Sequence, residues 1–91
     1  MKIVKISDVP SAWNNGGNWK KIIPEEERAE LNADILQFHE PSKYGINGGR
    51  ISKLCITNKK RDWLANYDRG WDVEPTEEIK EFYHEILEQF N

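Results

Sequence analysis

The 91-residue sequence is poor in the residues on which cross-linked and metal-bound folds depend. Its single cysteine, Cys55, excludes an internal disulfide framework and a cysteine-rich zinc site. The two histidines, His39 and His84, are isolated, and no spacing of His, Cys and Asp matches a metal site. We therefore expect neither a metal nor any other cofactor.

Long apolar runs are also missing. No stretch approaches the roughly 20 apolar residues needed to cross a bilayer. Residues 1–8 interrupt their apolar positions with charges and lack the apolar core of a signal peptide. These absences predict a soluble, cytoplasmic protein that has no membrane partner.

The residues that are present fit one small domain, residues 1–91. A hydrophobic content of 37% and four tryptophans argue against disorder, although 32% of the residues are charged. A chain of this size buries only roughly 60–65% of its unfolded surface, so it has one core and little room for a catalytic chamber. We expect a non-enzymatic protein, and homo-oligomerisation would enlarge its binding pocket.

Charge is distributed unevenly along the chain. Residues 1–42 carry five basic and seven acidic side chains, residues 43–71 seven basic and two acidic, and residues 72–91 one basic and seven acidic. The basic window indicates an anionic partner, although a basic sheet edge and an acidic helix could equally complement each other. Because the net charge is −3 and no helix-turn-helix or zinc pattern is present, DNA is not the expected partner.

The clearest predicted element is a C-terminal helix over residues 75–90. In EPTEEIKEFYHEILEQF, large apolar residues recur at helical spacing and form one stripe. Pro75 suits the first turn, and Glu77 and Glu78 favour the positive end of the helix dipole. The stripe requires a sheet to cover, and it comprises Ile79, Phe82, Tyr83, Ile86, Leu87 and Phe90.

Alternating apolar and polar residues predict the strands of that sheet. Leu54 and Ile56 mark the core face of one strand, and Cys55 in the same strand is interpreted as a small core residue. Residues 28–38 also alternate and are interpreted as a strand, but a helix over residues 24–38 competes because PEEERAELNADIL contains good helix formers. The other predicted strands cover residues 2–6, 18–23, 50–57 and 62–67.

These elements predict an α+β fold. An antiparallel β-meander of four to five strands would carry one C-terminal amphipathic helix on one face. The sheet would occupy residues 17–72, after an N-terminal extension formed by residues 1–16.

The stretch YGINGGRISKL, residues 44–54, contains three glycines at the start of a strand. Asn47-Gly48 is typical of a two-residue type I′ hairpin turn, whose central residues both need a positive φ. The glycines would also let a ligand approach the backbone, and successive amides in such a turn can bind an anion. Either way, the turn brings Arg50 and Lys53 to one place on the sheet.

A second turn, within NYDRGWD at residues 66–72, places an arginine between two aromatic residues. Guanidinium groups bind phosphate and aromatic faces stack on bases, so Arg69 with Tyr67 and Trp71 suits recognition of a nucleotide. The alternative is that Trp71 packs on the core beside the helix while Arg69 is solvated.

The blocks EPSKYGINGGRISKL and NYDRGWDVEP, followed by a short amphipathic helix, resemble a family of small proteins of Firmicutes and their phages and mobile elements. The resemblance covers about residues 17–91, carries no established activity and does not extend to residues 1–16. Its phage setting implies a protein of the bacterial host cell that counters immunity. Such proteins sequester a nucleotide second messenger or bind a host defence protein directly.

The leading hypothesis is a binding protein that sequesters a small anionic nucleotide ligand. In this hypothesis the arginines contact phosphates, Lys53 adds charge and an aromatic ring stacks on a base. One alternative is a protein–protein inhibitor or adaptor that uses the acidic helix face or the Trp-rich residues 10–19, and another is a phosphodiesterase using Asp62, Asp68 or Asp72. The candidate ligand-binding residues are Tyr44, Asn47, Arg50, Lys53, Tyr67, Arg69 and Trp71.

Overall fold

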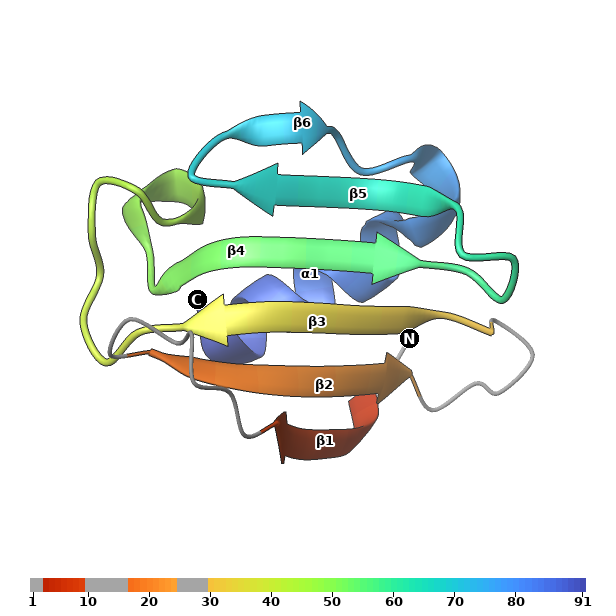
Figure 1. The fold of residues 1–91 in the computed structure, drawn as a ribbon, viewed down its shortest axis with the longest axis horizontal. Coiled ribbons are helices and arrows are strands. Elements are labelled where there is room, and N and C mark those ends of the chain that lie inside the picture. The colour runs from red at the N-terminus through yellow and green to blue at the C-terminus, as the bar shows by residue number, and fades with distance from the viewer. Residues whose placement is uncertain (1–2, 10–16, 25–29) are drawn as a thin grey trace.

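The computed structural model describes residues 3–9, 17–24 and 30–91. Over these residues it forms a six-stranded antiparallel sheet whose spatial order follows the chain order, with a helix behind it (Figure 1). The strands are β1 (Ile3–Val9), β2 (Asn18–Pro24), β3 (Asn32–Gln37), β4 (Ile51–Thr57), β5 (Trp63–Asp68) and β6 (Trp71–Val73). A 3₁₀ turn η3 (Glu77–Ile79) leads into helix α1 (Lys80–Phe90).

The predicted fold class, an antiparallel meander with one C-terminal helix, is confirmed. The open alternative over residues 24–38 is decided in favour of a strand, because β3 pairs with both β2 and β4. Residues 25–29 of this segment lie outside the described residues. The strand predicted over residues 2–6 is present in β1, which joins the sheet although the sheet was expected only over residues 17–72. The short strand β6 was not predicted, because three residues are too few to show an alternating pattern.

The core lies between α1 and one face of the sheet. The predicted apolar stripe of the helix is confirmed, since Ile79, Phe82 and Ile86 are fully buried and Leu87 packs against the same cluster. Burying several large apolar side chains in this way is the main favourable term for a domain of this size. The sheet contributes Ile22, Ala33, Ile35, Leu54, Ile56 and Ala65, among others.

No helix among the described residues covers the opposite face of the sheet, which is called the uncovered face below (Figure 1). Successive strand residues point to opposite faces, so Cys55, which lies between the core residues Leu54 and Ile56, belongs to this uncovered face. Cys55 is half-buried, and its predicted place in the core is therefore wrong. One row across this face joins Trp19, Leu36, Lys53 and Asp68, which are paired in register from β2 to β5.

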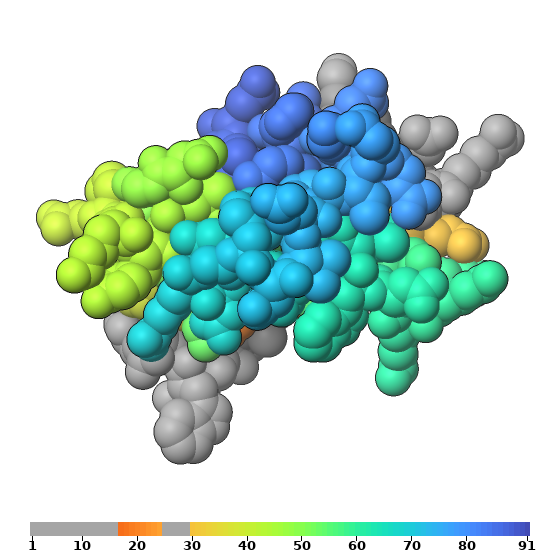
Figure 2. Space-filling view, turned by 90° about the horizontal axis from the view of Figure 1, so that it is seen from above, coloured from red at the N-terminus to blue at the C-terminus, as the bar shows by residue number. Residues whose placement is uncertain are grey.

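Residues 38–50 connect β3 to β4 at one end of the sheet. The predicted type I′ turn is present: Asn47 has φ 52° and ψ 31°, Gly48 has φ 73°, and the Gly49 amide donates to the Ile46 carbonyl at 2.9 Å. The predicted two-residue hairpin is wrong, because this turn (η2, Ile46–Gly48) interrupts a longer connection instead of joining two strands. In Figure 2 the yellow-green connection lies beside the cyan β5–β6 turn.

Asn91, which follows α1, fixes the β3–β4 connection to the helix. Its side-chain amide donates to the Ile46 carbonyl at 2.9 Å, and its side-chain oxygen accepts from the Ile51 amide at 3.1 Å. The last helical residue is bound as well, because the Gln37 side chain donates to the Phe90 carbonyl at 2.8 Å. Carbonyl groups at the end of a helix lack partners within it, so the Gln37 bond satisfies a group that water would otherwise have to satisfy.

No helix within the described part of the chain is long and apolar enough to cross a membrane.

Gly45→Ala is expected to lower the free energy of unfolding by about 1–3 kcal/mol. A Cβ at this position would collide with the Gly49 carbonyl oxygen, which is backbone and cannot move aside alone. Gly70→Ala is the matched control, because a Cβ there meets no described atom within 4 Å. Urea denaturation measures both variants, and equal losses would contradict the tight packing of this loop.

Candidate functional site

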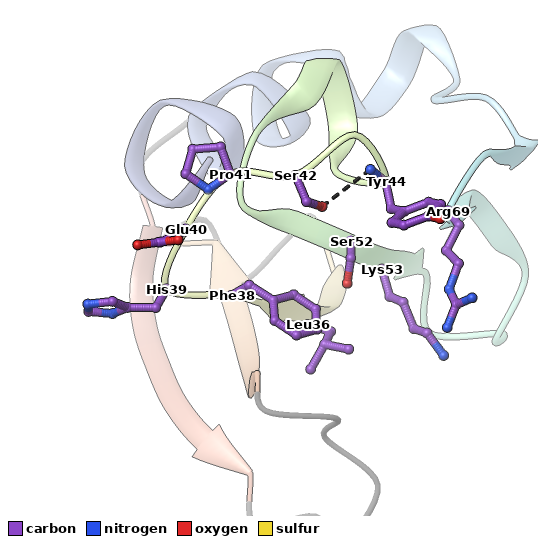
Figure 3. Close-up of a pocket in the computed structure, with 10 residues that line it drawn as sticks. All are labelled: Leu36, Phe38, His39, Glu40, Pro41, Ser42, Tyr44, Ser52, Lys53 and Arg69. Atoms are coloured by element: carbon purple, nitrogen blue, oxygen red, sulfur yellow. Dashed lines mark hydrogen bonds between the residues drawn. The ribbon is translucent and has the colours of Figure 1, made fainter.

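A pocket of about 580 Å³ lies where the β3–β4 connection meets β4 and the β5–β6 turn. Sites for small ligands typically have volumes of about 300–1,000 Å³. Figure 3 shows the Lys53 and Arg69 side chains extending in the same direction, with Tyr44 beside Arg69. The pocket is lined by Leu36, Phe38, His39, Glu40, Pro41, Ser42, Tyr44, Ser52, Lys53 and Arg69.

The backbone fixes the position of Arg69. This residue adopts a left-handed conformation (φ 60°) at the β5–β6 turn, and its amide donates to the Ser52 carbonyl at 3.1 Å. The Asp68 amide donates across the same turn to the Gly70 carbonyl at 2.9 Å. Because Ser52 precedes Lys53, the bond between Arg69 and Ser52 brings together two cationic residues, one from strand β4 and one from the β5–β6 turn.

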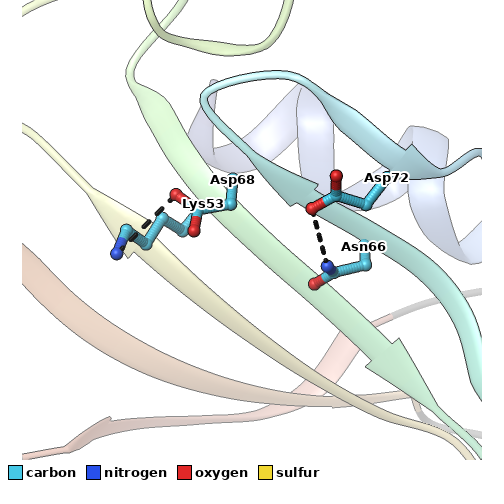
Figure 4. A network of polar contacts seen from close by, with 4 residues as sticks. All are labelled: Lys53, Asn66, Asp68 and Asp72. Carbon is cyan, nitrogen blue, oxygen red and sulfur yellow. Dashed lines mark hydrogen bonds and ion pairs between the residues drawn. The ribbon is translucent and has the colours of Figure 1, made fainter.

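Lys53 pairs with a carboxylate at the edge of the pocket. Its Nζ lies 3.7 Å from an Asp68 carboxylate oxygen, and both side chains are partly exposed (Figure 4). An exposed pair at this distance contributes about 0–1 kcal/mol, so a ligand anion competes with it readily.

Tyr44 is held by its backbone and presents an exposed ring. Its amide donates to the Ser42 hydroxyl at 3.2 Å, and its carbonyl accepts from the Tyr67 hydroxyl at 2.9 Å. The ring is 49% exposed, with the Lys43 Nζ 5.1 Å and the Arg69 guanidinium carbon 5.8 Å from its centroid. Cations within about 6 Å of a ring are attracted by its electron-rich face, so the Tyr44 ring favours the positions of the Lys43 and Arg69 cations beside the pocket.

The structure places Tyr67 and Trp71 behind this site. Their rings form an edge-to-face pair with centroids 5.0 Å apart, and Trp71 makes a similar contact with Tyr83 of α1 at 5.7 Å. Neither residue lines the pocket. Both pack on the core, as the structural alternative for Trp71 predicted, and Tyr67 reaches the site only through its hydroxyl.

Arg50 and Asn47 are not among the pocket-lining residues. The Arg50 carbonyl accepts from the Phe38 amide at 2.8 Å, and its amide donates to the Asn91 carbonyl at 3.4 Å. Asn47 occupies the left-handed turn position that its residue type tolerates. The structure thus unites Tyr44, Lys53 and Arg69 from the predicted set, and it gives Arg50 and Asn47 backbone roles in the connection.

Several lining residues were missed from the sequence. Leu36 directly follows the core residue Ile35, so its side chain lies on the uncovered face, where it meets Phe38 in the pocket. The adjacent apolar residues Ile35 and Leu36 were the available signal, since successive side chains of a strand point to opposite faces and one of the two must therefore lie on the face opposite the core. His39 and Glu40 lie at the left of Figure 3, away from Lys53 and Arg69 at the right.

The three aspartates proposed for a phosphodiesterase do not gather at one place. Asp62 binds Asn58 at the start of β5, whereas Asp68 ends that strand and pairs with Lys53. Asp72 accepts from the Asn66 side chain at 3.3 Å (Figure 4). Among the described residues no group of three or more His, Cys, Asp or Glu side chains could hold a metal ion.

A second hollow of about 250 Å³ lies on the uncovered face of the sheet. Burial raises the pKa of the Cys55 thiol in this hollow, and the neighbouring Asp34 carboxylate raises that pKa further. The hollow is lined by Trp19, Asp34, Lys53, Leu54, Cys55, Trp63, Asn66, Tyr67 and Asp68.

The chain belongs to the family described as a domain of unknown function, DUF7678, whose model matches residues 21–91. No curated protein and no solved structure matches the chain significantly.

Tyr67→Phe is expected to cost about 1 kcal/mol of unfolding free energy. The substitution leaves the Tyr44 carbonyl without the hydroxyl that bonds it, while the aromatic contacts of residue 67 persist. Tyr44→Phe is the control, because it keeps that carbonyl and the ring. Urea unfolding of both variants checks the expectation, and an unchanged Tyr67→Phe stability would show that this hydrogen bond does not fix the loop.

Proposed function

We propose that the protein is a non-enzymatic binding protein that sequesters a small anionic ligand of the nucleotide class. The observation that carries the proposal is the convergence of Tyr44, Lys53 and Arg69 on one pocket. These residues come from three separate segments of the chain. Backbone hydrogen bonds position two of them, Tyr44 and Arg69. Such convergence of charge and aromatic surface in a concave site is typical of a ligand pocket.

The cations of the pocket suit a phosphate. Arg69 offers a planar guanidinium that can bind two phosphate oxygens at once, and Lys53 adds a compact positive charge. Lys43 lies against the same Tyr44 ring as Arg69 and strengthens the local positive field. The apolar side chains of Leu36 and Phe38 line the same pocket and suit the sugar portion of a ligand.

The physiological ligand in this proposal is a nucleotide-derived immune signal of a bacterial host cell. The resemblance to small phage and mobile-element proteins supports this part of the proposal, in which the protein removes the signal by binding it. Homo-oligomerisation belongs to the same proposal, because a second copy beside the described lining residues would enlarge the pocket.

Calorimetry of the purified protein against cyclic nucleotides and ADP-ribose-derived nucleotides tests the proposal, together with mass spectrometry of any ligand released on denaturation. We expect at least one nucleotide to bind with a Kd below about 10 μM, which corresponds to roughly −7 kcal/mol. Absence of such binding would overturn the proposal. Enrichment of a host defence protein in a pull-down would then favour the inhibitor or adaptor hypothesis.

Arg69→Ala is expected to weaken nucleotide binding by roughly 10- to 100-fold, because a charge-assisted hydrogen bond contributes about 1.5–3 kcal/mol. Arg61→Ala is the matched control. Both arginines are exposed and occupy left-handed turn positions (φ 60° and 64°), but Arg61 lies beyond the opposite end of β4. Calorimetry measures both variants, and equal losses of affinity would contradict the assignment of the pocket.

A further inference from the structure

The uncovered face of the sheet presents an aromatic side chain that the fold does not explain. Trp63 is 60% exposed and lines the 250 Å³ hollow together with Trp19. Trp63 belongs to β5 and Trp19 to β2, with β3 and β4 between them. Ligand sites are lined mainly by hydrophobic and aromatic side chains, and two tryptophans are among the residues that line this hollow. The hollow is smaller than the usual 300–1,000 Å³ of a complete ligand site, so it suits one part of a ligand.

Lys53 connects this hollow to the 580 Å³ pocket, because it lines both. It lies near the start of the inner strand β4, paired with Leu36 on β3 and with Asp68 at the end of β5. Its ammonium group is therefore within reach of either space. A ligand whose phosphate contacts Lys53 could extend a second group over the sheet.

The chemistry of the two spaces differs. The larger pocket combines Lys53 with Arg69, whereas the hollow combines Lys53 with the carboxylates of Asp34 and Asp68. Carboxylates repel a phosphate, but they accept hydrogen bonds from the N–H groups at the edge of a nucleobase. The indole rings of Trp19 and Trp63 supply surfaces on which a base can stack.

The aromatic residues of the larger site are less suited to this role. The Tyr44 ring already has Lys43 and Arg69 close to its face, and Tyr67 and Trp71 pack on the core. Phe38 also lines the larger pocket, but the hollow offers a nucleobase bound near Lys53 the two indole rings of Trp19 and Trp63.

We propose that the hollow is a nucleobase subsite: Trp63 and Trp19 stack on the base of a nucleotide while Lys53 and Arg69 hold its phosphate. This inference rests on the proposed nucleotide-binding function and specifies how the ligand lies. The base occupies the uncovered face of the sheet and the phosphate lies at the sheet end.

Calorimetry with AMP and with ribose 5-phosphate tests the subsite, since both probes carry a 5-phosphorylated ribose and C1 bears adenine in AMP but a hydroxyl group in ribose 5-phosphate. Stacking on an aromatic side chain corresponds to about a 5- to 150-fold gain in affinity, and we expect AMP to bind more tightly than ribose 5-phosphate by that factor. Equal affinities that both depend on Arg69 would overturn the base subsite and leave the phosphate site intact. Failure of both probes to bind at 10 mM would overturn the subsite together with the anion site.

Variants of Trp63 locate the effect. Trp63→Ala should remove most of the preference for AMP and leave ribose 5-phosphate binding unchanged, and Trp63→Phe should retain most of the preference. The exposure of Trp63 makes both variants compatible with the fold. If Trp63→Ala alters the sedimentation of the protein but not its preference for AMP, the face is a protein interface and the subsite is wrong.

Cys55 provides a readout that is independent of affinity. It is the single cysteine of the sequence and it lines the hollow, so iodoacetamide reports on access to that space. Saturating AMP should slow its alkylation at least several-fold, whereas ribose 5-phosphate should leave the rate unchanged. Equal rates with both probes bound would place the base elsewhere.

Discussion

The pocket depends on the hydrogen bonds that fix residues 38–50 against the rest of the domain. The Tyr67 hydroxyl binds the Tyr44 carbonyl from the core side, and the Asn91 side chain binds the backbone on either side of the η2 turn. A long surface connection without such bonds would be mobile and would present no fixed ring beside Arg69. The core packing of Tyr67 and α1 therefore determines where the cations and Tyr44 meet.

A second constraint is that, in the described part of the chain, the single helix α1 covers one face of the sheet. The apolar stripe of α1 buries one face, and the alternation of strand residues then commits Leu36, Lys53 and Cys55 to the other. The uncovered face is consequently polar and aromatic at once, with carboxylates near its centre and Trp63 exposed. Lys53 projects from this face and lines both the 580 Å³ pocket and the 250 Å³ hollow.

The periodic patterns of the sequence were sufficient to predict the fold class, since the stripe from Ile79 to Phe90 and the alternation around Leu54 report directly on burial. They were not sufficient for the site. The predicted cluster of Arg50 with Lys53 assumed a tight hairpin, whereas Asn91 holds the connection in another arrangement through contacts distant in sequence. Tyr44 and Arg69 could be proposed from turn chemistry, but their meeting depends on the Arg69–Ser52 backbone bond, which no local pattern reveals.

The central claim is that an anion binds between Arg69 and Lys53, and a titration of ¹⁵N-labelled protein with pyrophosphate followed by NMR tests it most directly. The account predicts that the amide signals of Lys53, Arg69 and Gly70 shift together with one dissociation constant. The amides of residues 58–61, beyond the opposite end of β4, should remain unshifted. Shifts confined to residues 58–61, or signals that do not change at all, would contradict the account.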